Sequence, residues 1–258
     1  MVYTRGDADA LAYIAAVEGT GTSVSATQKT AINDFYVSAK ADSYYTSLKR
    51  LYLPIWANAA ANAIDMIGLT SGTFVGGVTH GTGYVMGNGT TGYFDLLDTP
   101  AELGLSASDA YQGFLCKTQA TLNPSVILGV RASASSVMNF SVSGTDLRAV
   151  FGSNAILTGT STEVGIITST RNPTTRSLWK RLTSGRSVVA TDSTAAAGSL
   201  PNLDLNYMRF NRSDGAPVYS DAQLGAVFFG VAFSDTHDTA FSLAIKNLWE
   251  TSTGLVLP

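Results

Sequence analysis

The sequence holds very little of what disulfide frameworks, thiolate metal sites and nucleic-acid interfaces need. Cys116 is the only cysteine, which excludes an internal disulfide and predicts a small buried side chain. Charged residues make up 14% of the chain, and the net charge is -3. Lys49–Arg50 and Lys180–Arg181 are pairs rather than a basic face, so we expect no nucleic-acid partner.

The residues of common catalytic and metal sites are also missing or scattered. A histidine-based metal site would need both histidines, His80 and His237, so we expect no metal and no cofactor. No Gly-x-Ser-x-Gly motif and no closely spaced carboxylates on one strand are present. Asp95 and Asp98 would lie on opposite faces of a strand and are expected to form turns. We therefore expect no catalytic residue and no enzyme, and a hydrolase using unrelated residues stays as an alternative.

One turn, residues 211–215, has two interpretations. Its Asn, Asp and backbone oxygens suit Ca²⁺, which prefers six to eight oxygen ligands. Asx-turn formation explains the same residues equally well, and we favour it.

The start of the chain lacks the features of a secretion signal or a membrane anchor. No basic region leads into an apolar core, and Asp7 and Asp9 interrupt where a signal peptide would be apolar. We expect no membrane insertion.

Residues 7–56 have the patterns of two or three helices. Asp7 or Asp9 could cap a helix over 10–17, and Ser25 with Gln28 forms a capping box for the next one. A third helical pattern at Tyr44, Leu48 and Leu51 ends before Pro54. Residues 1–57 are therefore predicted to be a helical N-terminal segment.

From about residue 58 the hydrophobic period becomes that of strands, and turn residues recur about every ten positions. Residues 224–233 are apolar at odd and even positions, which predicts a strand covered on both faces, and a helix follows after Ser234. The fold class is all-β, with a two-sheet antiparallel jelly-roll sandwich over residues 58–258 and a C-terminal helix. The predicted strands are 74–78, 83–86, 92–97, 110–118, 126–131, 137–142, 147–151, 164–169, 176–182, 186–191, 207–211 and 224–233.

Four stretches, at 80–97, 177–185, 207–220 and 224–233, follow one another in an order that resembles a known family. They are similar to the concanavalin A-like lectin/glucanase sandwiches, in the laminin-G-like form of bacteriophage structural proteins. The helical lead-in at 25–32 also resembles the segment that precedes this domain in phage proteins. The resemblance implies the concanavalin A-like fold and a phage origin.

Carbohydrate binding is the specific site that remains. Sugars are held by flat aromatic faces beside planar polar groups, which makes Trp179, Arg181, Tyr84 and Asn88 the predicted binding residues. Trp179 points away from Leu178 and shares a face with Arg181, so it should leave the inter-sheet core. An exposed Trp179 would favour glycan binding, whereas a buried one would count against it. The weaker candidates are Tyr111, Tyr207 and Arg209.

The resemblance favours a non-enzymatic virion structural protein, made in the host cytoplasm and assembled into the capsid decoration, tail, fibre or baseplate. Its expected partners are other virion proteins and itself, because a surface poor in charge suits close packing of subunits. The alternative is a carbohydrate-binding adhesin that recognises a glycan of the host surface.

Overall fold

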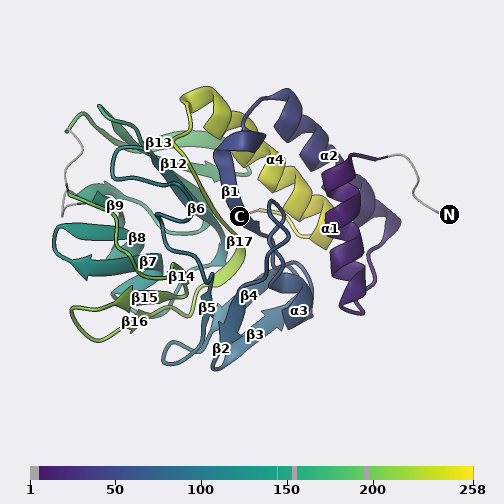
Figure 1. Ribbon diagram of the computed structural model, residues 1–258, viewed down its shortest axis with the longest axis horizontal. Helices are drawn as coiled ribbons and strands as arrows, with labels where there is room; N and C mark the ends of the chain where they lie inside the picture. Colours follow the sequence, from purple (N-terminus) through teal and green to yellow (C-terminus); the bar gives the residue numbers. More distant parts are fainter. Residues whose placement is uncertain (1–5, 144, 153–155, 195–197, 258) are drawn as a thin grey trace.

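The computed structural model describes residues 6–143, 145–152, 156–194 and 198–257, in which two packed β-sheets are covered on one side by helices (Figure 1). Three helices, α1, α2 and α4, lie together beside the sandwich, and the short α3 lies near β3. A 3-10 turn spans Tyr45–Ser47. The helices are α1 (Ala8–Gly19), α2 (Ala26–Ala41), α3 (Ala59–Asn62) and α4 (Asp235–Thr253).

The first sheet has eight strands in the order β13-β12-β11-β6-β17-β4-β3. The remaining strand, β1, pairs with β17 at the end that β4 leaves free. Its strands are β1 (Leu48–Tyr52), β3 (Val78–Gly81), β4 (Tyr84–Gly87), β6 (Ala110–Thr118), β11 (Gly165–Arg171), β12 (Arg176–Leu182), β13 (Gly185–Asp192) and β17 (Gln223–Gly230).

The second sheet has nine strands in the order β10-β9-β8-β7-β14-β5-β2. The β15–β16 pair joins it through β7, and this is a parallel contact. Its strands are β2 (Thr73–Val75), β5 (Tyr93–Asp95), β7 (Ser125–Ser133), β8 (Ser136–Ser143), β9 (Asp146–Gly152), β10 (Ile156–Thr160), β14 (Asn206–Tyr207), β15 (Arg209–Arg212) and β16 (Val218–Tyr219).

The apolar strand β17 is covered on both faces, as its sequence predicts. Leu224, Val227 and Phe229 belong to the core between the two sheets. Ala226 and Phe228 belong to the core between the first sheet and the helices. The all-β sandwich with N-terminal helices and a C-terminal helix is therefore confirmed.

The helix ends follow the predicted caps. The Asp7 carboxylate accepts hydrogen bonds from the first turn of α1, and Ser25 and Gln28 complete the capping box of α2. Ser234 caps α4, which ends at Gly254 in the left-handed conformation with φ 70°. These caps satisfy backbone groups that a helix leaves free at its ends.

The predicted third helix is wrong, because Leu48 and Leu51 lie in strand β1, which pairs with β17. Leu48 and Leu51 are both buried under the helices, so their spacing of three imitates a helical pattern. Pairing with β17 satisfies backbone groups that would otherwise be exposed at the edge of the sheet. The predicted boundary between residues 57 and 58 stays a prediction.

Two predicted strands are interrupted, and two strands besides β1 were missed. Gly76 and Met208 both have positive φ, at 69° and 64°, and they divide 74–78 and 207–211 into separate strands. β10 and β16 carry little apolar patterning and lie at sheet edges.

The buried side chain predicted for Cys116 is confirmed. Within the described ranges, no helix is both long and apolar enough to span a bilayer.

Candidate functional site

The structure places Trp179 and Arg181 beneath helix α4 rather than at the surface. Both side chains lie on the outer face of β12, as predicted, but Trp179 is only 4% exposed and the Arg186 guanidinium stacks on its ring at 4.5 Å. Arg181 is also buried and donates from Nε to Ser242 Oγ (2.8 Å) and from Nη2 to the Thr239 carbonyl (3.0 Å). The indole has no exposed face, so its placement counts against sugar binding by Trp179.

Tyr84 and Asn88 lie far from that pair, because three strands, β11, β6 and β17, separate β12 from β4. Tyr84 is half-buried, and the Lys117 Nζ lies 4.9 Å from its ring centre. The exposed Asn88 uses its Oδ1 to accept from the backbone N–H of Thr91 and Gly92, each at 2.8 Å. Asn88 therefore shapes the turn after β4, and the four predicted residues do not form one site.

The weaker aromatic candidates are not free either. Tyr111 and Tyr207 are fully buried. Arg209 stacks on the Tyr93 ring at 4.4 Å.

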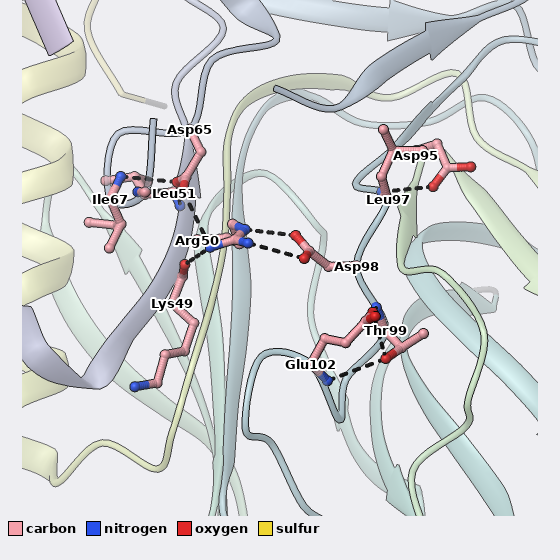
Figure 2. Close-up of polar contacts among 11 residues, drawn as sticks. Lys49, Arg50, Leu51, Asp65, Ile67, Asp95, Leu97, Asp98, Thr99 and Glu102 are labelled. Carbon is pink, nitrogen blue, oxygen red and sulfur yellow. Dashed lines mark hydrogen bonds and ion pairs between the residues drawn. The ribbon is translucent and has the colours of Figure 1, made fainter. Parts of the chain in front are cut away.

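A polar cluster joins β1 to the loop that follows β5 (Figure 2). Arg50 donates from Nε and Nη2 to the two oxygens of Asp98, at 2.7 and 3.0 Å, and its Nη1 lies 3.6 Å from Asp65 Oδ2. Asp95 forms a turn by accepting from the Leu97 N–H, as predicted, whereas Asp98 is an ion-pair partner and not a turn former. Since each of these carboxylates has a protein partner, the cluster is structural.

No group of three potential metal ligands occurs in the part of the chain that the structure describes. At the turn 211–215, the Asp214 carboxylate is held by Arg131 and Arg212, at 2.7 and 3.0 Å. Two guanidinium groups already neutralise the carboxylate that would bind Ca²⁺ there.

A polar cavity lies between the edge strand β10 and the open end of the β12–β13 hairpin. It has a volume of about 710 Å³ and is open to solvent. Five of its side chains carry a hydroxyl group, and a guanidinium and a carboxylate lie among them. The lining residues are Leu157, Thr158, Thr175, Arg176, Ser177, Ala190, Thr191, Asp192 and Ser193.

An ion pair forms the charged part of this cavity. The Arg176 guanidinium binds the Asp192 carboxylate, and only 2% of the Arg176 side chain is exposed, against 27% for Asp192. Hydrogen bonds from the Thr194 hydroxyl and backbone N–H, with help from Arg176, lower the pKa of Asp192 to about 2. The carboxylate is therefore ionised at neutral pH.

Arg171 lies immediately next to this pair. Its Cα is the β-ladder partner of the Arg176 Cα, and both side chains share the face of Ile167 and Leu178, which line the core between the sheets. Arg171 is 2% exposed, and neither its Nε nor its Nη1 has a hydrogen-bond partner among the residues described. Burial, followed by the neighbouring Arg176, lowers the pKa of Arg171.

The cavity can bind polar ligands, but its lining lacks the groups for glycoside hydrolysis. Arg and Asp side chains are planar groups that can each pair with two neighbouring hydroxyls of a sugar, and Ser and Thr hydroxyls both donate and accept. Hydrolysis by the usual route needs two carboxyl groups roughly 5 to 10 Å apart. Asp192 is the one carboxylate among the lining residues.

Sequence reasoning missed Arg171, Arg176 and Asp192. A signal was present, because Arg171 and Arg176 flank the turn Asn172-Pro173-Thr174-Thr175 between two predicted strands. Residues that flank a hairpin turn face each other across the ladder. Two arginines in such positions indicate a local concentration of positive charge.

No family model matches the chain, and no curated protein matches it in sequence. Among solved structures it is similar to the binding domain of botulinum neurotoxin DC in complex with SialylT, with a TM-score of 0.53, 8% identity and coverage of 78% of this chain and 52% of that one. A structure of botulinum neurotoxin type C, described as interacting with two ganglioside molecules, gives a TM-score of 0.51 at 9% identity, over 81% of this chain and 53% of that one.

A sialidase of Trypanosoma rangeli gives a TM-score of 0.50 at 11% identity, over 84% of this chain. The match spans 39% of the sialidase chain, and so less than half its length. At these identities the similarity defines the fold, which is a lectin-like β-sandwich.

Proposed function

We propose that this chain is a non-catalytic glycan-binding module whose binding site is the cavity between β10 and the β12–β13 hairpin. The observation that carries the proposal is the lining, where five hydroxyl side chains surround the Arg176–Asp192 ion pair. A volume of about 710 Å³ falls within the ordinary range of ligand pockets. Lectin-like neighbours that hold SialylT or gangliosides support a glycan as the ligand class.

Absence of catalysis is part of the same proposal. A single carboxylate lines the cavity, so the acid and the base or nucleophile of a glycosidase would not both be present. The module would hold its ligand without cleaving it.

A second candidate function is that of a bacteriophage virion component, and the resemblance of residues 25–32 and of four later stretches to phage proteins favours it. In this proposal the protein is made in the host cytoplasm, assembles into the virion with itself and other virion proteins, and uses the cavity to recognise the host surface. It predicts self-association, so light scattering that finds only monomers at high concentration would count against it.

The test of glycan binding is an array of bacterial surface polysaccharides probed with the purified wild-type protein and with Thr191→Trp. Thr191 lies on β13, is exposed and lines the cavity, so an indole there should fill it without disturbing the core. The matched control is Ser187→Trp, an exposed position of the same strand outside the cavity. We expect Thr191→Trp to lose binding and Ser187→Trp to keep it. Equal binding by all three proteins, or no binding by the folded wild type, would overturn the proposal.

A further inference from the structure

We propose that the cavity selects sugars that carry a carboxylate group, because two buried guanidinium groups at this end of the sandwich, those of Arg171 and Arg176, have the single carboxylate of Asp192 between them. The inference rests on the glycan-binding function proposed above and specifies the chemical class of the ligand. Its structural basis is the charge balance at this end of the sandwich.

Two guanidinium groups, of Arg171 and Arg176, share one carboxylate, that of Asp192. Arg176 holds this carboxylate directly. In the described chain, Arg171 has no hydrogen-bonding partner for Nε or Nη1, although only 2% of the residue is exposed. The cluster therefore has a net charge of +1 from two cations and one anion, and the Nε and Nη1 atoms of Arg171 are shielded from solvent.

Most other arginines of the described chain have carboxylate partners, so Arg171 differs from them. The pairs are Arg50–Asp98, Arg131–Asp214, Arg148–Asp146, Arg186–Asp238 and Arg212–Asp214. A buried cation without a partner destabilises a protein, because its lost hydration is not replaced. A ligand carboxylate would restore that balance, and guanidinium groups bind carboxylates through two parallel hydrogen bonds.

The surrounding lining favours a sugar acid over a simple anion. The carboxylate would lie at the Arg176 end of the lining, next to which Arg171 is placed by the ladder, and the ring hydroxyls would meet hydroxyl side chains such as Thr175 and Ser177. A small anion would use the guanidinium groups and leave the hydroxyl lining unused. The inference is therefore specific to a ligand that carries both kinds of group.

The experiment compares glucuronic acid with glucose, which differ only in the carboxylate at C6, by calorimetric titration at constant ionic strength. Acetate serves as the anion without the sugar. We expect the wild-type protein to bind glucuronic acid at least about tenfold more tightly than glucose and than acetate. Arg171→Met should lose this preference, and Arg131→Met, which removes an arginine paired with Asp214 elsewhere, should keep it.

Thermal unfolding of the unliganded proteins supplies the second readout. Since the Nε and Nη1 atoms of Arg171 have no hydrogen bond to lose among the described residues, Arg171→Met should unfold at the same temperature as the wild type or a higher one, whereas a structural arginine would give a lower temperature. Equal affinity for glucuronic acid and glucose, with loss of both in Thr191→Trp, would overturn the inference and leave the glycan-binding proposal intact. Acetate binding as tight as that of glucuronic acid would overturn it as well. Binding of neither sugar nor any polysaccharide would overturn both.

Discussion

Arginine side chains have opposite surroundings on the two faces of the sheet formed by β11, β12 and β13. On the outer face, Arg186 binds Asp238 and Asp235 at 2.7 and 2.9 Å, and Arg181 binds Ser242 and a helix carbonyl, so every guanidinium there is anchored to α4. On the inner face, Arg176 binds the carboxylate of Asp192, and the neighbouring Arg171 has no hydrogen-bond partner for Nε or Nη1 among the described residues. Paired charges hold the helix on the sheet, whereas the unbalanced charge indicates a place for a ligand.

The largest effect should come from breaking the balanced side. Asp238 is fully buried and accepts from Arg186 Nε and from the Tyr111 hydroxyl, each at 2.7 Å. Asp238→Asn should lower the free energy of unfolding by about 3–5 kcal/mol, because it removes the buried counterion of Arg186 and leaves that cation with the exposed Asp235 alone. Urea denaturation measures this change.

The matched control is Asp235→Asn, which removes the other carboxylate partner of Arg186. Its side chain is 71% exposed, so the loss should be about 0–1 kcal/mol. Equal losses for the two variants would mean that burial of the pair does not set its contribution.

Trp179→Ala distinguishes two possible roles of the Trp179 side chain, which are packing in the folded protein and sugar binding. The indole is buried and stacked on Arg186, so truncation should lower the free energy of unfolding by about 3 kcal/mol. Glycan binding by the folded variant should equal that of the wild type, since the cavity lies at the other end of the hairpin pair. Loss of binding at full stability would restore Trp179 as a sugar-binding residue.

Glu163, which precedes β11 at the end opposite Arg171, is a third buried ionisable group to compare with Asp238 and Arg171. It is fully buried, and its Oε2 has no partner within the described residues. Burial raises its pKa from the ordinary 4.5 to about 7. The folded protein therefore keeps the Glu163 proton up to about pH 7, whereas the unfolded chain loses it near pH 4.5.

The consequence is a stability that falls as the pH rises from about 4.5 to 7 and is level above that range. The loss should be about 3 kcal/mol in the free energy of unfolding. Glu163→Gln should remove this slope, because the amide stays neutral and its oxygen still accepts from the Ala120 N–H. Glu102→Gln is the control, since hydrogen bonds from Thr99 lower the pKa of that exposed carboxyl. A slope that persists in Glu163→Gln would assign it to another group.

The fold was predictable because its signals are local. The Ser25 capping box, the Ser234 cap and the apolar run of β17 each determine an element through neighbouring residues. β1 was not predictable in this way, because what makes it a strand is the free edge of β17, nearly two hundred positions along the chain. Short-range patterns carry no information about such an edge.

The candidate site was harder to predict because it depends on which charges find partners. The sequence correctly directs Trp179 away from the inter-sheet core, but it does not reveal that α4 covers that face. Arg171 and Arg186 are equally polar residues of predicted strands or their ends. Their difference depends on where the carboxylates lie in space. Asp238 lies beside Arg186 and pairs with it, whereas Asp192 pairs with Arg176 and not with Arg171.

The most direct test of this comparison is a nuclear magnetic resonance titration that follows the arginine Nε–H signals as glucuronic acid is added to the ¹⁵N-labelled protein. Variants at Arg171, Arg176, Arg181 and Arg186 would assign the four signals. We predict that the Arg171 and Arg176 signals shift until the site is saturated, while those of Arg181 and Arg186 stay in place. Shifts confined to Arg181 and Arg186, or no shift at any of the four, would contradict the assignment of the ligand site to the inner face.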